Sequence, residues 1–324
     1  MPGSQNLWTM TVDNDRYIIE MEEVTKSFGP VEVVKDLSFT VNRGQIFGLI
    51  GPSGCGKTTT IRLLLGIYFP TQGRISVLGM APHTFPRSVH ECIGYMPQLF
   101  VLYPNLTVQQ TLNFMASIYG LGATYRYKRM EQVLALVELT DARHKRTNKI
   151  SGGMKRRLEL ACALLHEPDL IFADEPTAGV DPILRAKFWD EFRALKAQGH
   201  SLFITTQYVS EAEYCDQVAV MDRGRLAVLG SPGELRRLAM GGEVIDVTSS
   251  GFTPESLDAV RALPGVQQVE SSSLYELRLY VDVAATCMPR ILNTLQSHDI
   301  EVKAADDYEP SFDEVFVRLL KDKA

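Results

Sequence analysis

The chain has 324 residues, 45% of them hydrophobic, and a formal net charge of −6 with a pI near 5.6. A chain of this length can bury a sizeable core and favours two domains. The acidic balance argues against a protein that coats nucleic acid, because such proteins need excess Lys and Arg to neutralise phosphates. Any anion that the chain binds must therefore be held by a local site.

The cysteines and the apolar segments argue against two further classes of protein. The five cysteines form no CxxC pair, so the sequence indicates neither a disulfide framework nor a zinc site: Cys55, Cys92, Cys162, Cys215 and Cys287. The N-terminal segment lacks the basic start and apolar core of a signal peptide, and no run of ~18 apolar residues occurs. We therefore expect a protein of the reducing cytosol that does not cross a membrane by itself.

The first third of the chain changes from alternating to continuous apolar patterning. Residues 1–16 are polar, and we expect a flexible tail there. Alternation over 17–21 and 37–41 predicts antiparallel strands. Residues 45–50 form a continuous apolar run, typical of a buried parallel strand, and a glycine-rich turn and a helix over about 57–66 follow it.

The middle of the chain combines a helical insert with a further strand–helix–strand unit. Helical spacing of apolar residues over about 106–139 predicts the insert. Apolar runs at 170–173 and 202–205 predict two more buried strands, with a helix over about 183–198 between them. This βαβ order is typical of a parallel sheet.

The last ~80 residues form a separate pattern that begins near residue 240. The order of elements is βαββαβ, which predicts a ferredoxin-like α+β module. Its strands are expected at 244–247, 266–269, 275–281 and 300–304, and its helices at 254–263 and 289–295. A final amphipathic helix follows a predicted capping box formed by Ser311 and Glu314.

A phosphate-binding loop is predicted between the strand at 45–50 and the helix that follows it. Residues 51–58, GPSGCGKT, match the pattern GxxxxGK[ST] in the expected strand–helix context. The glycines let backbone N–H groups turn toward phosphate oxygens, and the helix N-terminus adds partial positive charge. Lys57 would reach the β- and γ-phosphates, and the Thr58 hydroxyl would ligate Mg²⁺. The alternative is a glycine-rich turn without a ligand.

Two acidic residues, Asp174 and Glu175, end the apolar strand at 170–173. A parallel strand delivers its carboxyl end to the bound phosphates, so the two acids can divide the work. Asp174 would hold the Mg²⁺ shell, and Glu175 would polarise the water that attacks the γ-phosphate. A solvated turn is the alternative for an acidic pair considered in isolation.

The stretch ISGGMKRR over residues 150–157 precedes an amphipathic helix, with Ser151 placed as its N-cap. Here the chain resembles the ATP-binding subunits of ABC transporters, whose LSGGQ-type signature stands just ahead of the strand with the acidic pair. The resemblance covers residues 18–236, and several motifs match in order and spacing. Met154 departs from the commonest Gln, and the small-residue centre of the motif is retained.

The resemblance implies roles for residues at the nucleotide. The phosphates would be held by Gly51, Pro52, Ser53, Gly54, Cys55, Gly56, Lys57, Thr58 and Thr59. Phe28 would stack on adenine, although an aromatic residue near a strand is also common in a core. Gln98 would touch Mg²⁺ and relay to a membrane partner. Ser151, Gly152 and Gly153 would contact the γ-phosphate held by a second copy, and Asp181 would lie in a loop across that interface.

The resemblance also implies a domain organisation. The fold would be α/β, a P-loop ABC ATPase core over 17–238 with a RecA-like sheet, an antiparallel β subdomain and a helical subdomain over about 99–165. Outside the region of resemblance, the element order predicts the C-terminal α+β ferredoxin-like module over 243–324, which we expect to serve regulation or dimerisation. The cofactors would be ATP and Mg²⁺. The partners would be a second ATP-binding subunit, most simply a second copy of this chain, and a separate transmembrane permease, with no nucleic acid.

The function implied is an ATPase on the cytoplasmic face of the membrane that drives export, with the form of the drug-resistance branch. A non-transport ABC ATPase acting on nucleic acid or ribosomes is one alternative. The seven Lys and Arg of residues 143–157 could suggest nucleic acid, and a solvated face is the simpler interpretation. A ligand-gated ATPase controlled by the C-terminal module is the other alternative.

Gln207 stands where most members of this family have a histidine that reaches the γ-phosphate. A glutamine amide does not titrate, so it cannot replace a proton acceptor, but it can donate a hydrogen bond at similar reach. We therefore expect Gln207 to position the γ-phosphate and Glu175 to act as the base. A site that binds ATP without turnover is the alternative.

Overall fold

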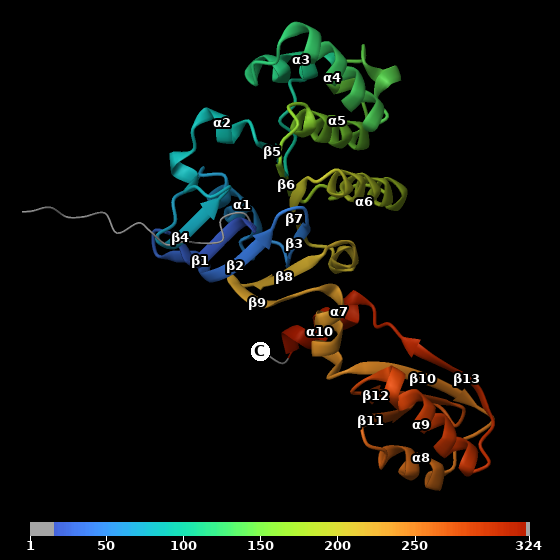
Figure 1. The fold of residues 1–324 in the computed structure, drawn as a ribbon. Helices are drawn as coiled ribbons and strands as arrows, with labels where there is room; N and C mark the ends of the chain where they lie inside the picture. Colours follow the sequence, from blue (N-terminus) through green and yellow to red (C-terminus); the bar gives the residue numbers. More distant parts are fainter. Residues whose placement is uncertain (1–15, 322–324) are drawn as a thin grey trace, which may run out of the picture. The chain divides into compact units, whose positions relative to one another are not determined.

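The structure is a computed structural model that describes residues 16–321. Apart from Arg16, the tail expected over 1–16 lies outside these residues. The described chain divides into two compact units, one running to residue 208 and including 214–226, the other comprising 209–213 and 227 onward. Figure 1 traces the elements of each unit along the chain. Among the described residues, no helix combines the length and the apolar character that a membrane span requires.

Three antiparallel strands form a small sheet in the first unit. Strand β1 (Tyr17–Phe28) lies between β2 (Val31–Asn42) and β4 (Gln72–Val77). The strands predicted at 17–21 and 37–41 are confirmed and are longer than the alternation indicated. Most apolar residues of β1 and β2 are buried, whereas Phe28 and Val31, beside the turn that joins the two strands, are exposed.

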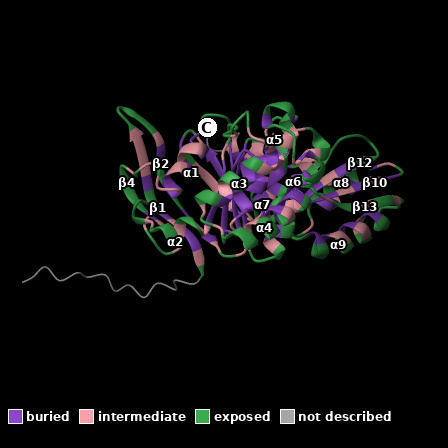
Figure 2. Ribbon diagram, turned by 90° about the horizontal axis from the view of Figure 1, so that it is seen from above, coloured by how far each residue is buried: buried purple, intermediate pink, exposed green. Residues whose placement is uncertain are grey.

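A six-stranded sheet forms the core of the first unit. Its order is β5-β6-β7-β3-β8-β9, and β3 pairs in parallel with β7 and β8. Its strands are β3 (Ile46–Ile50), β5 (Ile93–Met96), β6 (Leu170–Asp174), β7 (Ser201–Thr206), β8 (Gln217–Asp222) and β9 (Arg225–Gly230). Every residue of β3, β6 and β7 is buried. Figure 2 colours the buried residues of the chain purple. Burial on both faces explains why these strands are continuous apolar runs.

Helices flank this sheet and form the expected helical insert. The helices of the first unit are α1 (Lys57–Leu64), α2 (Arg87–His90), α3 (Val108–Ile118), α4 (Ala123–Leu136), α5 (Gly152–Leu164) and α6 (Pro182–Ala197). Short 3-10 turns of this unit occur at Pro82–Thr84, Thr140–Ala142 and Thr147–Lys149, whereas most of the turn at Val209–Tyr214 belongs to the second unit. Helix α3 starts at a full capping box, in which Thr107 and Gln110 each bond the backbone N–H of the other.

The second unit contains the predicted ferredoxin-like module. The antiparallel sheet has the order β11-β12-β10-β13, as the split βαβ arrangement requires. The elements of the unit are α7 (Pro232–Met240), β10 (Glu243–Ser249), α8 (Pro254–Arg261), β11 (Val266–Ser271), β12 (Glu276–Val281), α9 (Ala284–Ser297), β13 (Val302–Tyr308) and α10 (Phe312–Lys321). Apolar residues of β10, β12 and α9 form one core.

Two predictions in this module were wrong in detail. Helix α9 begins at Ala284, so Pro289 lies inside it, not at its start. Proline there removes one helical hydrogen bond, and burial of Cys287 and Ile291 in the core stabilises the helix nevertheless. The last strand, β13, runs from 302 to 308 and not 300–304, because its register follows β10 up to Tyr308.

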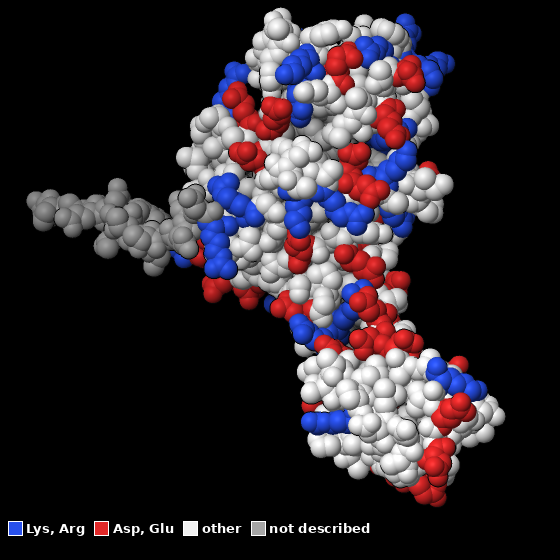
Figure 3. Space-filling model, turned by 45° about the vertical axis from the view of Figure 1, so that its right-hand side comes forward, with Lys and Arg blue, Asp and Glu red and all other residues white. Residues whose placement is uncertain are grey.

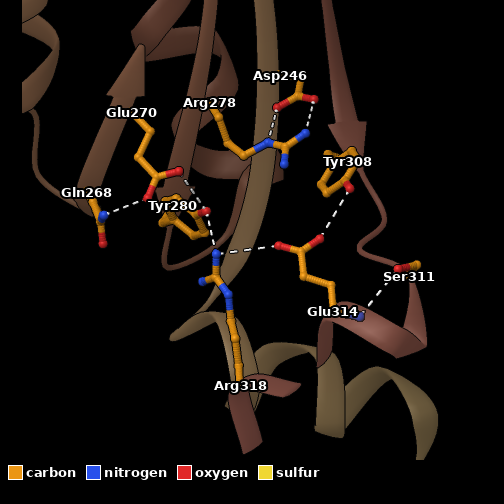
Figure 4. A network of polar contacts seen from close by, with 9 residues as sticks. All are labelled: Asp246, Gln268, Glu270, Arg278, Tyr280, Tyr308, Ser311, Glu314 and Arg318. Atoms are coloured by element: carbon orange, nitrogen blue, oxygen red, sulfur yellow. Dashed lines mark hydrogen bonds and ion pairs between the residues drawn. The ribbon is translucent and has the colours of Figure 1, made fainter. Parts of the chain in front are cut away.

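The predicted capping box before α10 is only half formed. The Glu314 N–H donates to Ser311 Oγ at 3.4 Å. The Glu314 carboxylate instead accepts from the Tyr308 hydroxyl at 3.3 Å and pairs with Arg318 at 3.4 Å (Figure 4). Because the Glu314 carboxylate contacts Tyr308 and Arg318, it does not turn back to the backbone N–H of Ser311.

A polar network occupies the sheet face opposite the module's core. Asp246 alternates with the core residues Ile245 and Val247, so it points to the other face. Both Asp246 oxygens accept from the Arg278 guanidinium at 2.8 Å, and this guanidinium lies 3.7 Å from the Tyr308 ring centroid (Figure 4). The bidentate geometry fixes the register of neighbouring strands β10 and β12.

Candidate functional site

The loop between β3 and α1 contains glycines at positions where neighbouring atoms of the same chain leave no room for a side chain. A Cβ atom on Gly51 would lie 2.2 Å from the Met221 carbonyl oxygen, and one on Gly56 would lie 2.9 Å from the Val33 carbonyl oxygen. Gly56 also has φ 116°, and it is the residue before the first turn of α1. Only glycine permits this conformation without strain, so backbone N–H groups can face the interior of the loop.

Lys57 crosses this loop and is almost fully buried. Its ammonium donates to the Gly51 carbonyl at 2.8 Å and to the Pro52 carbonyl at 3.1 Å, and it lies 3.3 Å from Glu175 Oε1. Cys55 is buried in the same loop, and burial raises the pKa of its thiol although Lys57 opposes the rise. Cys55 is therefore a neutral packing residue, and Lys57 supplies the charge of the loop.

Glu175 lies between two residues that the sequence predicted for the same site. Its Oε1 faces Lys57, and its Oε2 accepts from the Gln98 amide at 2.9 Å. A cavity of about 270 Å³ opens beside these groups. It is lined by Val33, Ser53, Gly54, Gly56, Lys57, Thr58, Thr59, Gln98 and Glu175. The structure thus brings the phosphate loop, the glutamine and the acidic residue together at one cavity.

The backbone at Glu175 is held in an uncommon conformation. Its φ of 48° is left-handed, which costs a residue with a Cβ atom about 1 kcal/mol or more. The Glu175 N–H donates to the Thr205 carbonyl at 3.0 Å and to Thr205 Oγ1 at 3.1 Å. Strand β7 therefore holds the turn that directs the carboxylate toward the cavity.

Asp174 is fully buried beside Glu175 and has the properties of a metal ligand. Its Oδ1 accepts from Thr205 Oγ1 at 2.6 Å, and its Oδ2 has no hydrogen-bond partner among the described residues. Burial raises the pKa of the Asp174 carboxyl, while the Thr205 and Thr58 hydroxyls oppose the rise. An orphaned buried carboxylate oxygen near a threonine hydroxyl fits Mg²⁺, which takes one or two protein oxygens together with substrate phosphates.

The predicted signature residues lie at the start of α5, outside the lining of this cavity. Ser151 caps α5, with Oγ accepting from the Met154 N–H at 3.2 Å. A Cβ atom on Gly152 would meet nothing within 4 Å, whereas one on Gly153 would lie 2.5 Å from Leu184 Cδ2. The single chain thus does not bring the signature to its own phosphate loop, and Gly152 stays open to an approaching group.

Asp181 acts first as a helix cap. Its Oδ1 accepts from the Leu184 N–H at 3.0 Å, and Pro182 follows at the first position of α6. The preceding Gly179 has φ 71° and open space around it. Asp181 lies outside the cavity lining, so its predicted role at an interface stays a prediction.

Phe28 is an exposed residue and not part of the core, with 42% of its surface accessible. Its ring meets Tyr68 edge to face at 5.2 Å between centroids, and the Lys26 ammonium lies 4.9 Å from it. Sequence reasoning missed Tyr68, which lies four residues after the end of α1 and belongs to no motif. An exposed ring packed against a half-buried tyrosine, with a nearby cation, has the chemistry to stack a base.

Gln207 directly follows β7 and is exposed, but it does not line the cavity. The backbone N–H of the neighbouring Tyr208 donates to Thr206 Oγ1 at 3.0 Å. The Arg185 guanidinium of α6 lies 4.0 Å from the Tyr208 ring centroid. These contacts fix the backbone on one side of Gln207 and leave its amide in solvent.

Thr205 and Val33 are further site residues that sequence reasoning missed. Thr205 is the partner of Asp174 in the β6–β7 ladder, so knowledge of the strand register would have identified it. Val33 belongs to the antiparallel sheet, and no local motif connects that sheet with the phosphate loop. Both residues reach the site through tertiary structure.

Known proteins resemble the chain in both sequence and structure. Residues 34–178 match the family described as ABC transporter. The chain is 39% identical over 231 residues to YbhF of Escherichia coli strain K12, a probable multidrug ABC transporter ATP-binding protein, covering 71% of this chain and 40% of YbhF. It is 33% identical over 307 residues to LnrL of Bacillus subtilis strain 168, a linearmycin resistance ATP-binding protein, covering 93% of this chain and 98% of LnrL.

A solved structure of an ATP-binding subunit of an ABC transporter superposes on the chain with a TM-score of 0.63 at 30% identity. The match covers 68% of this chain and 92% of that one. The chain therefore spans nearly the whole of LnrL and less than half of YbhF.

Proposed function

This chain belongs to the ATP-binding subunits of ABC transporters, a family of ATPases, and we propose that it hydrolyses ATP to drive export of drug-like or other hydrophobic compounds through a separate permease. The observation that carries the proposal is the Glu175 carboxylate, held between Lys57 at 3.3 Å and Gln98 at 2.9 Å beside the phosphate loop. YbhF is named as a probable multidrug transporter protein and LnrL is named for linearmycin resistance, and both names favour this class of cargo.

Residues that line the cavity, together with Asp174 and Gln207 outside its lining, would divide the work of hydrolysis. When bound, ATP supplies the phosphoryl group and Mg²⁺ supplies charge neutralisation. Thr58 and Asp174 would hold the metal ion, with Gln98 contributing at its edge. Lys57 has its ammonium on loop carbonyls, and exchanging these for phosphate oxygens replaces neutral partners with charged ones. Glu175 would accept the proton of the attacking water, and Gln207 would donate to the γ-phosphate.

A second copy of the chain would complete the site. Ser151, Gly152 and Gly153 stand at the N-terminus of α5, where a helix favours an anion, and Gly152 is open to close approach. We propose that they meet the phosphates held by the partner copy, with Asp181 at the same interface. Bound nucleotide would then stabilise the closed pair, and its hydrolysis would release it.

The permease would receive this change through the loop after Gln98 and the helical insert. That arrangement would place the chain on the cytoplasmic face of the membrane, peripheral to its permease. We propose that the ATP-binding domain spans 17–238 and that the module over 243–324 regulates the ATPase or enlarges the dimer interface.

Direct action on nucleic acid is the weaker alternative. Arg143 of the basic stretch pairs with Glu131 at 2.7 Å, and Arg157 pairs with Glu138 at 3.0 Å, so part of its charge is already neutralised. In the view of Figure 3, Lys and Arg are interspersed with Asp and Glu. Phosphate backbones favour a continuous basic surface.

Replacement of Glu175 tests the proposal. The variant Glu175→Gln should still bind ATP and should lose turnover by about a hundredfold or more, because a general base contributes about 10²–10⁴ in rate. Turnover and binding of a fluorescent ATP analogue are measured on the full chain, alone and with its permease. The exposed Glu276→Gln is the matched control. Parental turnover in Glu175→Gln, or a parental protein that binds ATP and never turns over, contradicts the proposal.

A further inference from the structure

Two charged residues of α5 are buried behind the signature. Arg156 and Glu159 are 5% and 4% exposed, and they lie one and two turns after Ser151. The Arg156 guanidinium pairs with Glu159 Oε2 at 3.2 Å. Charged side chains are rarely buried so completely unless other groups also satisfy them.

Their remaining partners are backbone groups of the loop after β5. Arg156 donates to the Pro97 carbonyl at 2.8 Å and to the Gln98 carbonyl. Glu159 Oε1 accepts from the Val101 N–H at 3.0 Å. The guanidinium also lies 4.9 Å from the Phe100 ring centroid. The pair thus holds the Pro97–Val101 loop at three backbone atoms and one side chain.

Stability alone is a weak reason for this arrangement. A buried ion pair loses much of its Coulomb attraction to desolvation, and apolar residues of equal volume often stabilise a fold as well. What apolar residues cannot supply is a set of donors and acceptors for the backbone groups of an irregular loop. The polar pair therefore specifies the conformation of the loop.

The same loop carries the side chain that contacts the proposed base. The Gln98 backbone carbonyl accepts a hydrogen bond from Arg156, and the Gln98 side-chain amide donates to Glu175 Oε2 at 2.9 Å. Hydrogen bonds therefore run without interruption from α5 through the loop to Glu175. A shift of α5 moves the atoms that hold the Gln98 backbone.

We propose that Arg156 and Glu159 are positioning residues that set the Gln98 amide against Glu175 and so couple the signature helix to the base of the same chain. This inference rests on the proposed function, in which the signature contacts nucleotide held by the second copy. Nucleotide at one site would then align the base at the other through α5, an effect on turnover more than on nucleotide affinity.

A comparison of two adjacent arginines tests the proposal. Arg156→Met removes the donors to Pro97 and Gln98 and should lower kcat about tenfold, with KM changed less than about twofold, because one misaligned hydrogen bond is worth about a decade in rate. Arg157→Met is the matched control, since Arg157 lies on the same helix and pairs with Glu138. It should keep the parental kcat.

The double variant with Gln98→Ala separates positioning from structure. If Arg156 acts through Gln98, the two kcat losses should not add, whereas independent damage to the fold adds. Glu159→Gln keeps the acceptor for the Val101 N–H and nearly the volume, so it should fold even where Arg156→Met does not, and its kcat should fall less. Steady-state kinetics on the full chain supply each value.

Three results overturn this inference: equal kcat in Arg156→Met and Arg157→Met, additive losses with Gln98→Ala, or a loss confined to KM. Failure of the proposed function looks different. In that case the parental chain shows no turnover, or Glu175→Gln turns over at the parental rate.

Discussion

Two helices of the first unit, α1 and α5, begin at glycine-rich segments. The two segments differ in how much space surrounds their glycines. Before α1, a Cβ atom on Gly51 or Gly56 would press on backbone oxygens of the chain itself, at 2.2 and 2.9 Å. In the first turn of α5, a Cβ atom on Gly153 would meet only a side-chain end, and one on Gly152 would meet nothing within 4 Å. The first loop needs glycine in order to fold.

This difference distinguishes two reasons why a position can require glycine: packing within the chain, and close approach of a group from another molecule. Internal packing accounts for Gly51 without any ligand, so its presence says little about function by itself. Nothing inside the described chain accounts for Gly152, so a reason for it must come from outside the chain. The comparison predicts that stability should respond strongly to substitution in the first loop and weakly in the second.

The largest loss of stability is expected for Gly51→Ala. Its Cβ atom would lie 2.2 Å from the Met221 carbonyl and 2.8 Å from Cys55 Sγ, and a backbone atom of β8 cannot easily move. Overpacking costs about 1–3 kcal/mol and more where the backbone is fixed, so the free energy of unfolding should fall by at least about 3 kcal/mol. Urea unfolding followed by Trp189 fluorescence measures it.

Gly122→Ala is the control for Gly51→Ala, because a Cβ atom there meets nothing within 4 Å. Its unfolding free energy should match the parental value within about 0.5 kcal/mol. If the two variants unfold at the same urea concentration, the internal explanation for Gly51 is wrong.

The second prediction concerns Glu159, which holds α5 to the loop after β5. Its carboxyl group can gain or lose a proton, whereas the backbone carbonyls that surround the loop before α1 cannot. Burial raises the pKa of Glu159 from 4.5 to about 7, although the Val101 N–H and Arg156 oppose the rise. The folded state therefore binds more protons than the unfolded state between these values. Stability from the protonated carboxyl is complete below about pH 4.5 and is lost as pH rises through about 7.

Glu159→Gln isolates this contribution, because glutamine does not titrate and other groups cancel in the difference. The unfolding free energy of Glu159→Gln minus that of the parental chain should rise between pH 4.5 and 7 and level off above. The nearby Cys162 thiol stays neutral in this window, since burial raises its pKa to about 12. A difference that is flat with pH would contradict the prediction.

A smaller loss is expected for Gly153→Ala, where the obstacle is Leu184 Cδ2 at 2.5 Å. The end of a partly exposed leucine can move, so the loss should be about 1 kcal/mol, the low end of overpacking costs. The double variant with Leu184→Ala removes the obstacle and should be more stable than the sum of the single effects. Strict additivity in urea unfolding would show that Leu184 is not the constraint.

Sequence reasoning found those parts of the site whose spacing is local. The phosphate loop lies between a strand and its helix, and Asp174 and Glu175 end a strand, so a few neighbouring residues determine where each one lies. Thr205 and the contact of Glu159 with Val101 depend on strand register and helix packing across long separations.

The fold divides in the same way. The order βαββαβ was sufficient for the C-terminal topology, because alternation and turns are local signals. The position of Pro289 inside α9 was not predictable, because core burial of Cys287 and Ile291 outweighs the local signal of proline as a helix start. The half-formed cap at Ser311 has the same origin, since tertiary partners take the Glu314 carboxylate.

The smallest effect on stability is expected for Gly152→Ala, and this variant tests the comparison most directly. Gly152 is the first residue of α5, where alanine forms helix more readily than glycine, so the unfolding free energy should be unchanged or rise by up to about 1 kcal/mol. Binding of ATP to the single chain should keep its parental Kd, because the signature does not line the cavity.

Turnover should nevertheless fall about tenfold or more, since an added methyl group blocks close approach of phosphate oxygens to the helix N-terminus. Gly122→Ala, equally open, should leave turnover unchanged. Parental turnover in Gly152→Ala would mean that no group approaches this glycine closely, and the second helix start would then need glycine for neither fold nor function.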